Sequence, residues 1–140
     1  MKEYQLYIGG EFVNSVSGQT FDSLNPYNQN VVANVARAGV EDVHHAVMAA
    51  RKAFDDGRWT GLSNEKRSAL LKAISDAINE KKNELELLEV EDSGSTIRKA
   101  KEDVYLSARS MNYFSKLAAM DLTTSIEGLS KPGFSQNLLV

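Results

Sequence analysis

The two histidines are the first candidates for chemistry, because imidazole can act as an acid, a base or a metal ligand near neutral pH. His44 and His45 are adjacent in the sequence. On a helix, neighbouring side chains point about 100° apart, so this pair cannot chelate one ion, which requires i, i+4 spacing. Neither histidine has an identifiable partner acid for a serine nucleophile. The sequence therefore favours a surface or packing role for both.

A dense group of carboxylates follows in the middle of the chain: Glu84, Glu86, Glu89, Glu91 and Asp92. Acids on an exposed helix face usually form a solvated surface. Asp92 differs because it sits at the expected C-terminal end of a helix, just before Gly94, where the helix dipole disfavours negative charge. Two interpretations stay open for Asp92: a solvated acid, or an acid with a compensating partner such as a cation.

No self-contained active site is predicted. The chain has no cysteine, which excludes a thiol nucleophile, a thiolate metal site and a disulfide within it. The Asp-Ser-Gly-Ser segment at 92–95 lacks the flanking glycines and the Lys-Ser/Thr ending of a phosphate loop. Ser93 has no base to activate it.

Length and composition indicate one soluble domain. The 140 residues are 42% hydrophobic and 25% charged, with a net charge of −3. Positive residues are dispersed, so nucleic-acid binding is not expected. No stretch approaches the ~18 apolar residues of a membrane span, and the N-terminus lacks a signal-peptide pattern. These features predict a cytoplasmic protein that does not bind membranes.

The first 36 residues predict a run of small β elements. Alternation from Tyr4 to Ile8 predicts one strand with a buried face, and Gly9-Gly10 predicts a hairpin turn before Phe12. Further strands are expected at 20–24, ended by Pro26, and at 31–36.

Four helices are expected next. Gly39 and Gly57 bracket the first, whose apolar stripe contains Val43, Val47, Ala50 and Phe54. Ser63 is the expected N-cap of the second, whose buried face would contain Leu70, Ile74, Ala77 and Ile78.

The third helix is expected to start from a capping box of Asn83 and Glu86 and to end at Gly94. Its expected buried side consists of Leu85, Leu87, Leu88 and Val90. The fourth, at 96–120, is apolar on more than one face, which is typical of a helix buried between layers.

Apolar and polar residues alternate again at the C-terminal end. A loop is expected from 123 to 133, followed by a strand at 134–140. Chain termini usually lie at the surface, whereas this chain stops on Leu138, Leu139 and Val140. We interpret the sequence as part of a longer protein.

Several strings at ordered spacings resemble the NAD(P)-dependent aldehyde dehydrogenase superfamily. They are LYIGGEFV, a hydrophobic residue before Asn25-Pro26, VARAGVEDVHHAVMAARKAF, WTGLSNEKRSALL and ELLEVEDSG. The last is similar to that family's Glu-x-x-Asp-x-Gly segment. Ser93 stands where the family usually has asparagine, and Ser95-Thr96 where Lys-Pro is common. The resemblance covers residues 5–140.

The resemblance implies an α/β fold for the whole protein, of which this segment is mainly α-helical, with short N-terminal β-hairpins and a C-terminal strand. Residues 1–36 would form small β elements, 40–122 a helical layer of the cofactor-binding domain, and 134–140 the start of an oligomerisation strand whose partner follows the chain's end. The whole protein would oxidise a small aldehyde with NAD or NADP as a homodimer or homotetramer. The nucleophilic cysteine would lie outside this chain, which alone would be inactive.

The resemblance also implies two sites on this chain. Some family members bind a monovalent cation, Na⁺ or K⁺, at positions that match Asp92 and the main-chain carbonyl of Leu24. The helix before Tyr113-Phe114 contributes to an aldehyde tunnel in the family, which points to Leu106. An alternative from a different class stays open: a stand-alone, non-catalytic helical domain that binds another protein through the apolar face of residues 97–120.

Overall fold

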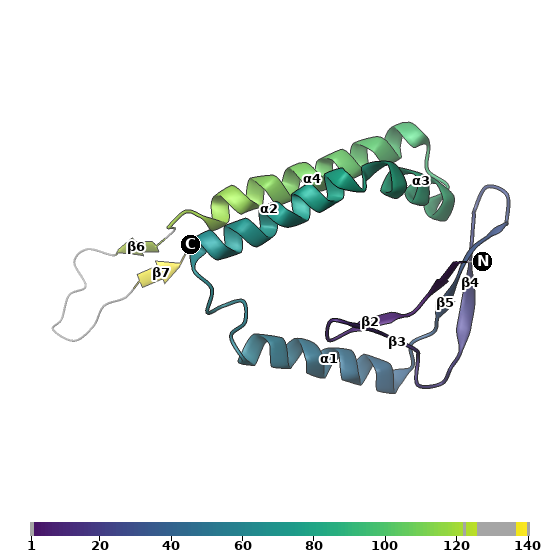
Figure 1. The fold of residues 1–140 in the computed structure, drawn as a ribbon, viewed down its shortest axis with the longest axis horizontal. Coiled ribbons are helices and arrows are strands. Elements are labelled where there is room, and N and C mark those ends of the chain that lie inside the picture. Colours follow the sequence, from purple (N-terminus) through teal and green to yellow (C-terminus); the bar gives the residue numbers. More distant parts are fainter. Residues whose placement is uncertain (1, 122, 126–136, 140) are drawn as a thin grey trace.

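The N-terminal β elements form a three-stranded sheet and a separate hairpin (Figure 1). The computed structural model describes residues 2–121, 123–125 and 137–139. In the sheet, β5 (Val31–Ala36) lies between β1 (Lys2–Tyr4), which runs parallel to it, and β4 (Thr20–Leu24), which is antiparallel. The hairpin joins β2 (Leu6–Ile8) to β3 (Glu11–Val13). Both of its turn residues, Gly9 and Gly10, have positive φ, as a tight hairpin turn requires.

The bounds of β4 and β5 confirm the sequence-based prediction, but the single strand from Tyr4 to Ile8 was wrong. The strand is interrupted at Gln5. Before this residue β1 pairs with β5, and after it β2 pairs with β3. The alternation continues across the break and cannot reveal it, because the choice of partner is set by residues far away in the sequence.

Helix α1 (Val40–Asp55) is tied to the preceding loop by a buried carboxylate. Asp42 is only 3% exposed and accepts hydrogen bonds from the backbone N–H of Gly39, at 2.8 Å, and of Val16, at 3.0 Å. Gly39 is the N-cap, so one of these bonds satisfies a donor at the helix start. The other fixes the loop that follows β3 against the same turn.

The remaining helices form one layer. Helices α2 (Asn64–Glu80) and α4 (Ile97–Ala118) pack antiparallel, and α3 (Lys82–Ser93) connects them. Small residues are buried within this layer: Ser75, Ala100, Ala108 and Ser115. The Ser75 hydroxyl donates to the Ala108 carbonyl at 2.8 Å, and the Asn64 amide donates to the Met120 carbonyl at 3.2 Å. These two bonds set the register of the pair.

The caps of these helices follow the sequence except at α3. Ser63 caps α2 and Thr96 caps α4, while Gly94 ends α3 in the left-handed region. The capping box of Asn83 and Glu86 was wrong, because α3 begins at Lys82, directly after the residue that caps α2.

The expected buried faces are largely uncovered. Val43, Val47 and Phe54 of α1 are 55%, 59% and 64% exposed. Leu70, Ile74, Leu87, Leu106 and Tyr113 are also exposed, against the expectation of buried faces on α2, α3 and α4. Among the described residues, the buried apolar side chains are Ala33, Ala100 and Ala108. The apolar stripes predicted helices correctly, but the surfaces that would cover them are not among the described residues.

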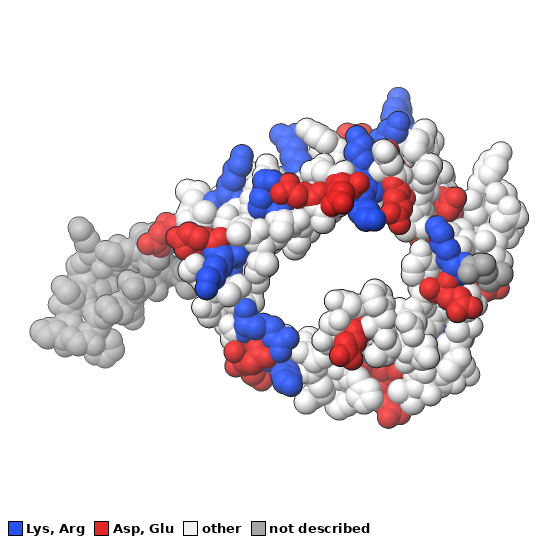
Figure 2. Space-filling view, in the orientation of Figure 1, with Lys and Arg blue, Asp and Glu red and all other residues white. Residues whose placement is uncertain are grey.

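The elements enclose an opening instead of a core. Helix α1 and the β elements lie on one side, the α2–α4 layer lies on the other, and Figure 2 shows the hole between them. The β lobe and the layer are joined by the chain from 56 to 63 at one end, and meet where β4 approaches α3 at the other. None of the described helices could span a membrane.

The end of the chain forms a short hairpin of β6 (Thr123–Ser125) and β7 (Asn137–Leu139). The sequence predicted a loop where β6 lies, and a partner for the last strand beyond residue 140. The loop prediction was wrong at residues 123–125, which form β6 and pair antiparallel with β7. The predicted partner beyond residue 140 stays a prediction, because a strand that is paired on one edge can still pair on its other edge. The rest of the predicted strand, 134–136 and 140, lies outside the described residues.

Asp42→Asn is expected to destabilise the protein. The two backbone donors bond different oxygens of Asp42, and an asparagine offers only one acceptor oxygen. The hydrogen bonds from Gly39 and Val16 lower the pKa of Asp42. The ionised Asp42 carboxylate therefore contributes its full stabilisation above about pH 3.9, the pKa of an aspartate in the unfolded chain. This stabilisation is lost as the pH falls through the lower pKa that Asp42 has in the folded protein.

Thermal unfolding from pH 2 to 7 measures this effect. The midpoint of the variant should lie below that of wild type at pH 7, and the two should converge in acid. Glu41→Gln is the matched control, since Glu41 is an exposed acid in the same helical turn. Equal effects of the two variants would mean that only helix-dipole charge matters.

Candidate functional site

The C-terminal end of α3 meets the end of β4 and forms the candidate site. The Ser23 hydroxyl donates to Asp92 Oδ1 at 2.6 Å, across 69 residues of sequence. Beside this bond, Gly94 lies against Pro26: a Cβ on Gly94 would be 3.3 Å from the Pro26 Cβ. Gly94 also has a φ of +70°. A glycine is needed here both for the left-handed backbone and for the close approach.

Leu24 lies at an irregular point of β4. The register with β5 shifts between Ser23, which pairs with Ala33, and Leu24, which pairs with Val31. Such bulges occur often beside functional sites because they redirect the backbone. The turn that follows is held by the Asn25 side chain, which accepts from the Tyr27 N–H at 2.9 Å. The structure thus brings Leu24 and Asp92, the two residues matched to a cation site, into neighbouring segments.

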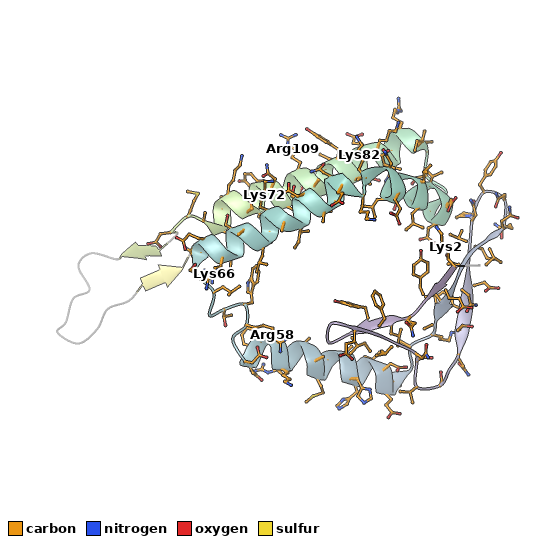
Figure 3. All side chains as sticks on the ribbon, in the orientation of Figure 1. Lys2, Arg58, Lys66, Lys72, Lys82 and Arg109 are labelled. Carbon is orange, nitrogen blue, oxygen red and sulfur yellow. The ribbon has the colours of Figure 1, made fainter. Side chains whose placement is uncertain are left out.

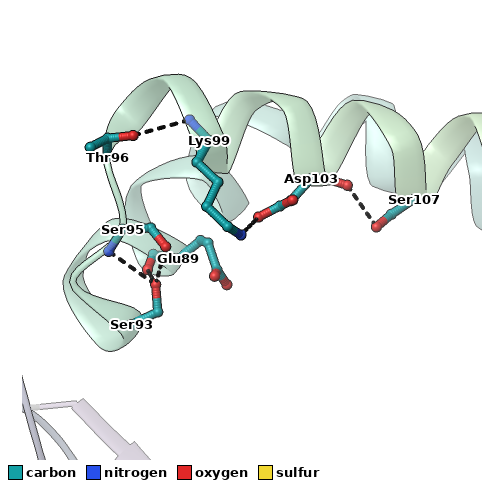
Figure 4. A network of polar contacts seen from close by, with 7 residues as sticks. All are labelled: Glu89, Ser93, Ser95, Thr96, Lys99, Asp103 and Ser107. Atoms are coloured by element: carbon teal, nitrogen blue, oxygen red, sulfur yellow. Dashed lines mark hydrogen bonds and ion pairs between the residues drawn. The ribbon is translucent and has the colours of Figure 1, made fainter.

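Hydroxyl groups stabilise the turn from α3 to α4 (Figure 4). The Ser93 hydroxyl donates to the Glu89 carbonyl at 2.6 Å and accepts from the Ser95 N–H at 3.2 Å. The Thr96 hydroxyl accepts from the Lys99 N–H at 3.4 Å. The Ser93 hydroxyl therefore links the last turn of α3 to the loop that follows it.

Asp92 is an exposed residue near the end of α3. Lys99, in the first turn of α4, forms its ion pair with Asp103 (Figure 4). Every ion pair between described residues joins groups other than Asp92. Asp92 also lies at the rim of a groove of about 340 Å³ between α3 and α4, whose apolar wall consists of Ile78, Leu85, Leu88 and Val104. Ser23 bonds one carboxylate oxygen, and the acid remains without a cationic side chain at a helix end that disfavours it.

The other candidates lie apart from this contact. His44 and His45 are exposed on α1, with ring centroids 6.4 Å apart. No three His, Cys, Asp or Glu side chains of the described residues are grouped to hold a metal ion. Leu106 lies on α4, 44% exposed, while its neighbours Val104 and Ser107 line the groove beside Asp92.

Sequence reasoning missed Ser23. Its only signal is a hydroxyl directly before the Leu24-Asn25-Pro26 run, and this gains meaning only when β4 is known to end beside α3. Gly94 was interpreted as a helix stop, and its contact with Pro26 is equally invisible in the sequence.

Comparison with known proteins identifies the family. The model of the aldehyde dehydrogenase family matches residues 12–137. Aldehyde dehydrogenase 1 of Tanacetum cinerariifolium is 45% identical over 101 residues, which are 72% of this chain and 20% of that protein. A mitochondrial aldehyde dehydrogenase of Arabidopsis thaliana, family 2 member B4, is 37% identical over 91% of this chain and 23% of its own length.

Solved structures agree in fold. A betaine aldehyde dehydrogenase variant from Staphylococcus aureus, crystallised with NAD⁺, aligns with a TM-score of 0.88 at 34% identity. The alignment covers 95% of this chain and 27% of that one. The chain belongs to the aldehyde dehydrogenase family and has its α/β fold, as the sequence resemblance indicated. It spans about a fifth to a quarter of the length of the relatives described above.

Ser23→Ala is expected to loosen the contact between β4 and α3. The variant removes a hydrogen bond to a charged acceptor that is partly exposed, so the free energy of unfolding should fall by about 1 kcal/mol. Ser107→Ala is the control, because the exposed Ser107 hydroxyl donates only to the Asp103 carbonyl in its own helix. Chemical denaturation of both variants gives the comparison. An equal loss in the two would show that Ser23 contributes no long-range contact.

Proposed function

We propose that this chain is the N-terminal part of an NAD(P)-dependent aldehyde dehydrogenase that oxidises an aldehyde to a carboxylic acid. The family match over residues 12–137 carries the proposal. The NAD⁺ in the Staphylococcus aureus relative supports the cofactor class. Bound NAD(P)⁺ would supply the acceptor for hydride. The aldehyde itself would be small, and the choice between NAD and NADP depends on residues outside this chain.

The chain supplies structure and no catalytic group in this proposal. Covalent aldehyde oxidation requires a thiolate that attacks and later leaves. The chain has no cysteine, so the nucleophile must come from beyond residues 1–140. We assign no residue of this chain to the cofactor either. Residues 1–140 alone are therefore predicted to be inactive.

We propose that residues 40–122, which contain α1 in addition to the layer of α2, α3 and α4, form a helical cover of the cofactor-binding domain. The exposed apolar side chains of α1, such as Val47 and Phe54, support this role, because isolated apolar stripes of this size are costly in water. Leu106 stays the predicted contact with the aldehyde tunnel. Residues 134–140 stay the predicted start of the oligomerisation strand of a homodimer or homotetramer. If α1 covers the cofactor-binding domain, its apolar side chains should be protected from chemical labelling in the whole protein. Analytical sedimentation of the whole protein would measure the subunit number.

Asp92 and the Leu24 carbonyl are the proposed ligands of Na⁺ or K⁺. Hard cations prefer carboxylate and carbonyl oxygens. The unpaired charge of Asp92 and its position beside the end of β4 support the assignment. Ser23 would hold the carboxylate in place through Oδ1. The remaining ligands would be water or residues outside the chain.

The cytoplasm stays our predicted compartment. The Arabidopsis relative carries the word mitochondrial in its name, so fractionation of the source cells decides the question.

The activity prediction is tested with two proteins. The full-length protein should reduce NAD⁺ or NADP⁺ in the presence of an aldehyde panel, measured by absorbance at the nicotinamide band, and residues 1–140 should not. Product analysis should find the carboxylic acid. A full-length protein that folds but oxidises none of the aldehydes would reject the proposal, and would favour a stand-alone binding role for the helical layer.

Asp92→Ala is expected to weaken the dependence of stability on Na⁺ or K⁺. Removing the carboxylate removes a ligand, so thermal midpoints of the full-length variant should respond less to these salts than those of wild type. Lithium or choline chloride at equal ionic strength controls for screening. Glu91→Gln, an exposed acid on the same helix, is the matched variant. An unchanged Na⁺ and K⁺ response in Asp92→Ala would contradict the site.

A further inference from the structure

A second groove lies where α2 meets α3, on the side facing α4. It has a volume of about 220 Å³. Its lining includes Asn79, Lys82, Glu86, Lys101, Val104 and Tyr105, and includes neither Leu24 nor Asp92. Figure 3 shows Lys82 at the junction of the two helices, away from the central opening.

Glu86 is the unusual residue of this groove. It is 6% exposed, although glutamate is almost never buried without a partner. None of the hydrogen bonds or ion pairs between described residues involves its carboxylate. No described buried side-chain oxygen is both fully shielded and unbonded, so the oxygens of Glu86 reach the solvent of the groove.

Two lysines, whose charge is opposite to that of Glu86, line the same groove. Lys82 lies one turn before Glu86, at a spacing that ordinarily favours an ion pair, yet their charged groups are not within 4.0 Å. The neighbouring Lys81 pairs with Glu84 instead. Lys101, on α4, is likewise absent from the ion pairs of the described residues. The groove is therefore lined by one acid, Glu86, and by two lysines, Lys82 and Lys101, that form no ion pair with it.

Neutral groups add further contacts. The Asn79 amide nitrogen donates to the Ser75 carbonyl at 3.0 Å, which leaves its side-chain oxygen as an acceptor. Tyr105, 60% exposed, supplies a ring and a hydroxyl at one wall, and Val104 a small apolar surface. Acceptors and donors are thus both present around an apolar patch, as in sites for small polar molecules.

We propose that this groove binds a compact zwitterion of the α-amino acid class. Glu86 and the Asn79 oxygen receive the ammonium group, and Lys82 and Lys101 receive the carboxylate. The volume equals that of about seven waters at roughly 30 Å³ each, which accommodates a small amino acid. The site is separate from the proposed cation ligands, and it does not depend on whether the protein oxidises aldehydes.

Ligand-observed NMR on the full-length protein tests the site with three matched probes. L-alanine carries both charges, propionate lacks the ammonium group, and ethylamine lacks the carboxylate. We expect saturation transfer to L-alanine and at least about tenfold weaker binding of the other two, since each loses charged hydrogen bonds. Glu86→Gln and Lys101→Gln should each weaken L-alanine binding by about tenfold.

Glu84→Gln is the control, because Glu84 is exposed on the same helix and outside the groove. Binding elsewhere in the protein is common to all variants and cancels in the comparison. Equal L-alanine binding by wild type and Glu86→Gln would overturn the proposal. Propionate binding as tight as that of L-alanine would also overturn it, by revealing a site for anions only. Aldehyde oxidation by Glu86→Gln should equal that of wild type, which separates failure here from failure of the proposed enzyme activity.

Discussion

The contact between the end of β4 and the end of α3 closes the molecule. The chain between α1 and α2 provides a second, covalent link between the β lobe and the helical layer. The contact consists of one hydrogen bond, from Ser23 to Asp92, and the close packing of Gly94 on Pro26. Its stabilisation is small compared with the entropy of holding two lobes together, because an exposed hydrogen bond of this kind contributes only about 1 kcal/mol. A cation between Asp92 and Leu24 would add to the same joint.

The contact between the β lobe and the helical layer contributes little stability because the two parts bury little apolar surface. The interior of the helical layer is built from alanine and serine, which allow α2 and α4 to approach closely but bury little apolar area. Larger apolar side chains of α1, α2 and α4 are exposed instead. The free energy that would make this arrangement rigid must come from surfaces that cover those side chains.

The sequence predicted local features well and long-range ones poorly. Alternation and turn residues defined β4 and β5, and side-chain chemistry identified Ser63 as a helix cap and Gly94 as a helix stop. The break at Gln5 was missed because strand partners are chosen across 30 residues or more. Asp92 was recognised as misplaced from the helix dipole alone, whereas Ser23 required the fold. The apolar periodicity correctly predicted the helices. It does not indicate whether the surface that packs against each apolar face lies within residues 1–140.

The order of synthesis gives the open ring a further consequence. The joint at Asp92 needs only the first 94 residues, so both lobes can meet soon after they leave the ribosome. In a protein of the relatives' length, roughly four fifths of the polypeptide would still have to be translated, at about 5–20 residues per second. During those tens of seconds Val47, Phe54 and Leu70 face water. The contact of Ser23 with Asp92 and of Gly94 with Pro26 would then hold an early intermediate with exposed apolar surface. The residues translated later could pack into its central opening.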